Sequence, residues 1–276
     1  MIVTSAQLFK AVPSALNKTV KDFLVKSGSG LKGRYSFKGI ELKKKNDLKL
    51  PQSSIEGAEL AGINECKKSY CAVKLLNSTE KPRMEAAFDK LGLFQQLLYE
   101  RIMAYIRTGE IKGSEEVSSN LETLSFAYST LSFLPTRYPG VNKWISESIF
   151  KQQVPPVKRP FIDSMLCLET IHLDSDKVKP VLRIAEIFEF EEADSNIYFD
   201  LHLYSNHFSD SSLRIFEVLK SADSRKPSVL VLTDVMEIDE LKKSGLIRAL
   251  FKGKMVSAIH RYQKDVLDWI EGNLKG

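Results

Sequence analysis

The sequence lacks most of the features by which a function is usually recognised. It has no run of 18 or more apolar residues, so no membrane-spanning helix is expected. Its first residues, MIVTSAQLFKAVPS, lack the basic and apolar segments of a secretion signal. No Gly-rich phosphate-binding loop, paired-carboxylate motif or G-x-S-x-G nucleophile motif occurs. No motif therefore fixes a reaction, and we expect no cofactor.

Cysteine is scarce, with three residues in a chain of 276. Cys66 and Cys71 have a spacing that a local disulfide can close, but two reduced thiols fit it equally well. No further His or Cys pair lies at a matching distance, so no metal site is expected. Cys167 lies in the apolar run MLCLETI and is predicted to be a buried free thiol.

The composition is that of a globular protein with a substantial core, since 43% of the residues are hydrophobic. We expect residues 1–276 to form a single domain. The formal net charge of +5 is compatible with peripheral contact with an anionic membrane surface. It falls short of the concentrated excess typical of nucleic-acid binders, so we expect no nucleic-acid partner.

Helical periodicity dominates the first half of the chain. A short helix is predicted near residues 14–26, followed by a strand in RYSFKGIEL. A longer helix from Arg83 to Arg107 has an apolar face that includes Phe88 and Leu98. Two more helices are predicted at about 114–133 and 141–150, so residues 83–150 form a helical insertion.

After Pro160 the pattern changes to strands. Five apolar stretches follow one another with short polar breaks, which favours an antiparallel meander. The chain closes with a helical apolar stripe from Leu241 to Lys275, interrupted at Gly253. The predicted fold class is α+β, with a curved antiparallel β-sheet packed on a long C-terminal helix.

This outline resembles the START-like, or helix-grip, superfamily, in which a sheet wraps the last helix and encloses a cavity. Several stretches also resemble an uncharacterised family of secreted bacterial proteins: CKKSYCAVKL at 66–75, YPGVNKW at 138–144, ETIHL at 169–173 and LYSNHFSDSSL at 203–213. The likeness covers most of the chain from about residue 40. It departs from the family pattern at Leu201, His202, Phe208 and Ser209, where the polar contacts of a ligand would differ.

The resemblance favours a disulfide between Cys66 and Cys71, because those relatives look exported. It also implies a periplasmic or secreted protein whose signal has been removed; the alternative is a cytoplasmic protein. It supplies no activity.

Residues 200–213, DLHLYSNHFSDSSL, are the densest group of reactive side chains in the sequence. As a strand, this stretch sends Leu201, Leu203 and Ser205 to one face and the intervening residues to the other. Either a ligand-lining role or a structural role fits. The candidate ligand-binding residues are His172, His202, Tyr204, Asn206, His207 and Phe208. A catalytic alternative uses His207 as a base oriented by Asp210.

The block from Leu241 to Lys264 contains seven basic residues and no acidic residue. Three acidic residues follow it directly: Asp265, Asp268 and Glu271. This basic patch could meet anionic lipid headgroups, but it also fits the solvated face of a helix.

These observations predict a non-enzymatic protein of the bacterial envelope that binds a lipid or other hydrophobic small molecule between its sheet and C-terminal helix. Two alternatives stay open. One is a hydrolase-type enzyme using His207 and Asp210, and the other is a structural or interaction module with a filled interior.

Overall fold

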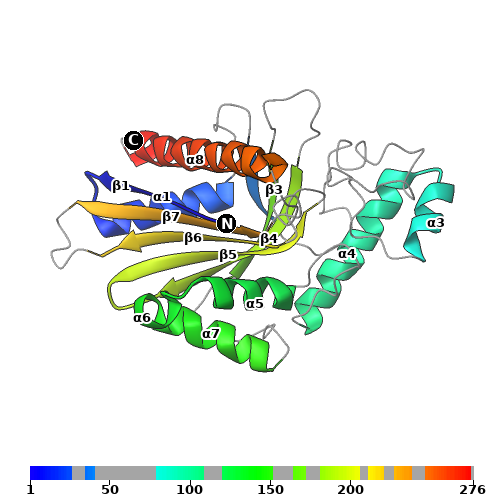
Figure 1. Ribbon diagram of the computed structural model, residues 1–276, viewed down its shortest axis with the longest axis horizontal. Helices are drawn as coiled ribbons and strands as arrows, with labels where there is room; N and C mark the ends of the chain where they lie inside the picture. Colours follow the sequence, from blue (N-terminus) through cyan, green and yellow to red (C-terminus); the bar gives the residue numbers. More distant parts are fainter. Residues whose placement is uncertain are drawn as a thin grey trace.

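A seven-stranded antiparallel sheet forms the centre of the computed structural model, which describes residues 1–26, 35–40, 79–108, 120–151, 164–171, 181–205, 211–220, 227–237 and 246–274 (Figure 1). The strands are β1 (Ile2–Phe9), β2 (Tyr35–Ile40), β3 (Ser164–Ile171), β4 (Val181–Glu191), β5 (Ser195–Ser205), β6 (Ser211–Leu219) and β7 (Ser228–Glu237). Their order in the sheet is β1-β7-β6-β5-β4-β3-β2.

The meander from β3 to β7 confirms the five predicted strands. β2 confirms the predicted strand in RYSFKGIEL and joins one edge of the meander, beside β3. β1 was not predicted from the sequence, and it pairs with β7 at the opposite edge. In β1, apolar residues lie on both faces: Val3 and Phe9 are buried, whereas Ile2 and Leu8 are exposed. Period-two alternation, which reveals the other strands, is therefore weak here.

Helices cover both faces of the sheet. One face carries α1 (Pro13–Lys26) and α8 (Leu246–Leu274), whose Phe23, Val266 and Ile270 are fully buried. The other face packs on α4 (Lys90–Thr108), α5 (Asn120–Thr130), α6 (Leu134–Arg137) and α7 (Pro139–Phe150). The two faces give two hydrophobic cores separated by the sheet. No helix in the described ranges is long and apolar enough to cross a bilayer.

The prediction of one helix from Arg83 to Arg107 is wrong in one respect, because two helices occupy this stretch. α3 (Glu80–Ala86) ends before Phe88, and α4 begins at Lys90. Asp89 starts α4 by accepting a hydrogen bond from the Gly92 N–H at 2.8 Å, which is an N-cap contact. Phe88 lies in the break and is fully exposed, so it is not part of the buried face.

The remaining helices were predicted closely. The first residue of each of α1, α5, α7 and α8 differs from the predicted first residue by one to six positions. α8 continues through Gly253 without a break in the helix. α7 begins at Pro139, and Glu192 from the turn after β4 accepts hydrogen bonds from the N–H groups of Gly140 and Val141 at its first turn.

Candidate functional site

The two faces of β5 differ in polarity as the sequence predicts. Leu201 and Leu203 lie in the core against α4–α7, whereas Asp200 and His202 face the side that carries α8. A β-bulge then breaks the alternation, because His202 pairs with Ala185 and Tyr204 pairs with Ile184, the residue next to it. The alternation predicted for residues 200–206 is confirmed from Asp200 to Leu203, and for the side chains of Tyr204, Ser205 and Asn206 it stays a prediction.

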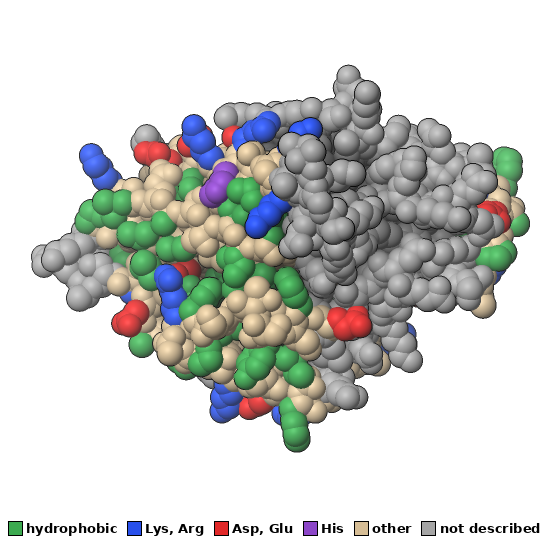
Figure 2. All heavy atoms as spheres, viewed as in Figure 1, with side chains coloured by type: hydrophobic (Ala, Val, Ile, Leu, Met, Phe, Trp, Pro, Cys, Tyr) green, Lys and Arg blue, Asp and Glu red, His purple; other side chains and the backbone are tan. Residues whose placement is uncertain are grey.

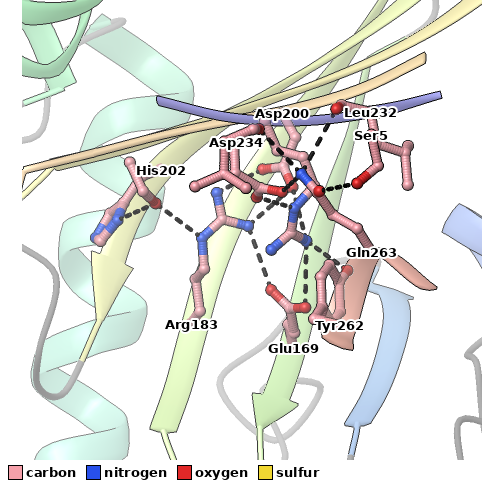
Figure 3. Close-up of polar contacts among 12 residues, drawn as sticks. Ser5, Glu169, Arg183, Asp200, His202, Leu232, Asp234, Tyr262 and Gln263 are labelled. Carbon is pink, nitrogen blue, oxygen red and sulfur yellow. Dashed lines mark hydrogen bonds and ion pairs between the residues drawn. The ribbon is translucent and has the colours of Figure 1, made fainter. Parts of the chain in front are cut away.

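A row of alternating charges crosses the sheet beneath α8 (Figure 3). Each strand from β3 to β7 contributes one side chain, and each of these residues is less than one-tenth exposed. Strand pairing places Glu169 opposite Arg183, and Arg214 between Asp200 and Asp234. We call this set the charged row; from β3 to β7 it consists of Glu169, Arg183, Asp200, Arg214 and Asp234.

Arg183 joins the first three members of the charged row. Its Nη1 and Nη2 donate to the two carboxylate oxygens of Asp200 at 2.9 and 2.7 Å, which is a bidentate pair. Nη1 also donates to Glu169 at 3.4 Å, and Nε donates to the Ser212 hydroxyl at 3.3 Å. The guanidinium is thus fixed in its plane by three strands.

Arg214 connects the charged row to α8. Its Nε donates to Asp234 at 2.7 Å, and its Nη1 donates to the Tyr262 hydroxyl at 2.6 Å and to Glu169 at 3.3 Å. The guanidinium carbon also lies 4.2 Å from the centre of the Tyr262 ring, within cation–π range. Nη2 donates no hydrogen bond to any residue that the structure describes.

Gln263 makes a second connection between α8 and the sheet. Its Nε2 donates to Asp234 at 2.8 Å and to the backbone carbonyl of Val3 at 3.0 Å. Its Oε1 accepts a hydrogen bond from the Ser5 hydroxyl at 2.6 Å. Since Gln263 is fully buried, these contacts fix how far α8 lies from β1 and β7.

The electrostatics of the charged row keep its arginines charged. Burial alone would lower the pKa of Arg183, but attraction and hydrogen bonding to Asp200 outweigh it and raise the pKa above its ordinary value. Burial likewise opposes the charge of Arg214, and Glu169, among other partners, raises its pKa well above the ordinary value. Burial is also the largest cause that raises the pKa of Tyr262, so its hydroxyl stays protonated. The three carboxylates and two guanidiniums have a formal charge of −1.

His202 extends the polar cluster toward the end of β5. It is 2% exposed, and its Nδ1 lies 3.0 Å from the Ser212 hydroxyl. Ser212 accepts from Arg183, and the direction of its hydrogen bond with His202 depends on the tautomer of the ring. His202 thus packs as part of a buried hydrogen-bond chain.

The other candidate residues stay predictions. The predicted ligand-binding or catalytic residues His172, Asn206, His207, Phe208 and Asp210 lie outside the described residues, as do Cys66 and Cys71. Tyr204 is described only as part of the backbone of β5. Cys167 confirms its prediction: it is a free thiol, 1% exposed, with a pKa raised mainly by burial.

A surface recess of about 530 Å³ lies on the opposite side of the sheet, between α6, the start of α7 and the turn after β4. Its one guanidinium, Arg137, is paired with the buried Glu217 at 2.5 Å. The Tyr138 hydroxyl donates to the same carboxylate at 2.7 Å. Glu217 therefore acts as an acceptor that anchors the α6–α7 corner to β6.

The charged row suits binding better than catalysis. All its carboxylates accept hydrogen bonds from arginine, so none is placed as a general base. Within the described ranges, no group of three or more His, Cys, Asp or Glu side chains is arranged to hold a metal ion. What the row offers to another molecule is guanidinium N–H donors in a buried, slightly acidic environment.

The charged row was not predicted from the sequence, although the sequence contains a signal for it. Each of the five predicted strands carries a charged residue next to an apolar one, as in LCLET, VLRIA, YFDLH, SLRIF and VLTDV. A single such residue fits a solvent-facing position. The signal lay in its recurrence in every strand, with the sign of the charge alternating from strand to strand.

No protein-family model matches the chain, and neither a curated protein nor a solved structure was found to be similar to it. The structure itself shows an antiparallel sheet packed against a long C-terminal helix, with helices inserted in the first half. That arrangement is compatible with ligand binding, since it has the outline of helix-grip folds.

Proposed function

We propose that this protein is a non-enzymatic binding protein that holds a lipid or other hydrophobic molecule between its sheet and α8. The observation that carries the proposal is the guanidinium of Arg214. It lies under α8 beside Asp234, Glu169 and Tyr262, and its Nη2 has no acceptor among the described residues. The side chain is 10% exposed, so an acceptor that belongs to a ligand can reach Nη2 and complete the hydrogen bonding of the guanidinium.

The packing of α8 indicates which part of the helix meets the ligand. Toward its C-terminal end, Val266 and Ile270 are fully buried in the core with α1, which leaves no room there. Earlier on the helix, Met255 is only partly buried, and Ile259 is buried outside both core clusters. Met255 and Ile259 are one turn apart and point the same way as Tyr262. The ligand would lie against this earlier half of α8.

The charge of the site restricts the ligand. The charged row has a formal charge of −1, so a carboxylate or phosphate brought to Arg214 would meet three carboxylates as well. A neutral acceptor, such as an ester carbonyl or a hydroxyl, would accept from Nη2 without that repulsion. We therefore propose an apolar molecule with a neutral polar group, bound in the bacterial envelope.

The experiment is to extract organic-soluble molecules from the purified protein and identify them by mass spectrometry. Ile259→Trp places a large side chain at the proposed contact, and Ser257→Trp places the same side chain on the exposed side of α8. We expect a co-purified neutral lipid in the wild type and in Ser257→Trp, and its loss in Ile259→Trp. Retention in both variants, or no bound molecule in the wild type, would count against the proposal.

A further inference from the structure

The outer edge of β1 carries backbone groups that pair with nothing in the described chain. Met1 and Met236 exchange two backbone hydrogen bonds at 2.9 Å. Because such pairs alternate along an antiparallel ladder, the odd-numbered residues of β1 bond to β7. The N–H and C=O groups of Ile2, Thr4, Ala6 and Leu8 therefore point away from the sheet. No hydrogen bond from these backbone groups occurs among the described residues.

The side chains of this edge do not protect it. Ile2 is 44% exposed and Leu8 is 64% exposed, on the face of β1 opposite α8. Figure 2 shows hydrophobic side chains gathered over β1 and β7, between α8 above and α5 and α7 below. Charged residues and prolines usually keep edge strands from pairing with another chain. The strand IVTSAQLF contains neither. Within the part of the chain that the structure describes, nothing pairs with the outer edge of β1, which can therefore accept another strand.

We infer that a second copy of this chain pairs with β1, strand against strand, about a two-fold axis through Ser5. In an antiparallel ladder with this centre, Thr4 lies opposite Ala6 of the second copy, and Ile2 lies opposite Leu8 of the second copy. The outward-pointing backbone groups then bond to one another. The exposed apolar side chains at the two ends of each strand cover each other in pairs, so the strand is complementary to itself.

The charges on α8 favour a second copy over an unrelated strand. Ser5 contacts Gln263, so a two-fold axis at Ser5 also passes near Gln263 and sets the two copies of α8 antiparallel. Among the described side chains of α8, the exposed charged residues before that point are basic, including Lys252 and Lys254, and those beyond Lys264 are acidic, namely Asp268 and Glu271. The basic half of one helix therefore lies toward the acidic half of the other. This arrangement gives the basic patch found in the sequence a partner.

The register is tested with Thr4→Cys and Ala6→Cys, two exposed positions of β1. Directly opposed Cα atoms in hydrogen-bonded antiparallel pairs are about 5.5 Å apart, within the range of a disulfide. Mild oxidation of a mixture of the two full-length variants should give a disulfide between position 4 of one chain and position 6 of the other. Each variant alone should give much less of the cross-linked dimer, and the unsubstituted protein provides the background from its native cysteines.

The contribution of the side chains is tested by sedimentation equilibrium. Leu8→Lys should raise the dimer dissociation constant by about tenfold or more, because it places a charge against Ile2 of the second copy. Phe150→Lys removes an equally apolar side chain that is 88% exposed and remote from β1, and it should leave dimerisation unchanged. A wild type that stays monomeric at every concentration, or equal weakening by both variants, would overturn the inference. So would the absence of the disulfide between positions 4 and 6.

Discussion

Replacing Arg214 with methionine should strongly destabilise the protein, because it removes the side chain that joins the charged row to α8. The side chain is 10% exposed and donates to Asp234 at 2.7 Å, to Tyr262 at 2.6 Å and to Glu169 at 3.3 Å. Its removal changes the formal charge of the row from −1 to −2 and leaves two buried carboxylates with one donor fewer. Removing one partner of a buried ion pair costs about 3–5 kcal/mol. That is a large part of the roughly 5–15 kcal/mol by which domains are stable.

Urea denaturation followed by circular dichroism measures this loss. Lys151→Met is the matched control, because it makes the same kind of substitution in an exposed pair with Glu147 at 3.7 Å. Exposed pairs contribute little, so the control should lose no more than about 0.5 kcal/mol. Adding Asp234→Asn to Arg214→Met should recover part of the stability, since it removes one unpaired charge. A loss below about 1 kcal/mol for Arg214→Met would refute the view that the row is a buried, mutually compensated network.

Three further predictions concern other parts of the molecule. Trp144→Ala should lower the free energy of unfolding by about 3–5 kcal/mol, because the indole packs within a buried aromatic cluster. Phe150→Ala, on the same helix but at a position that is 88% exposed, should change it by less than about 0.5 kcal/mol. Equal effects of the two substitutions in urea denaturation would contradict this packing. Burial raises the pKa of Tyr262, so at a pH above about 10 an unfolded tyrosine loses its proton while Tyr262 in the folded state keeps it. The free energy of unfolding should therefore fall as the pH rises above about 10. The urea midpoint of Tyr262→Phe should fall less steeply with pH than that of the wild type. A thiol titration of the denatured, unreduced protein should find one free thiol if Cys66 and Cys71 are bridged, and three would rule the bridge out.

Most of the fold could be predicted from the sequence, because most elements bury one regular face. β3 to β7 are marked by apolar runs between polar breaks, and α8 by its stripe of residues such as Ile259, Val266 and Ile270. The two errors have local causes. Phe88 fits the helical period, but capping by Asp89 starts a new helix there. β1 is apolar on both faces and so lacks the alternation that identifies a strand.

The candidate site was harder to predict, because it depends on register. Nothing in the sequence states that Asp200 lies opposite Arg214, or that Arg214 lies opposite Asp234. A charged residue in a strand of an antiparallel sheet usually faces water, and each member taken alone fits that description. Only the pairing of five strands, with Tyr262 brought over them by α8, makes these residues one buried cluster.

The proposed function is tested most directly by fluorescence titration with two dyes that share one apolar body. N-phenyl-1-naphthylamine is neutral, and 1-anilinonaphthalene-8-sulfonate carries one negative charge. The charged row under α8 has a formal charge of −1, which repels the sulfonate. The site should therefore bind the neutral dye about tenfold more tightly than the sulfonate. Ile259→Trp should abolish that binding, and Ser257→Trp should preserve it. Tighter binding of the sulfonate, or binding of the neutral dye that Ile259→Trp leaves unchanged, would contradict the account.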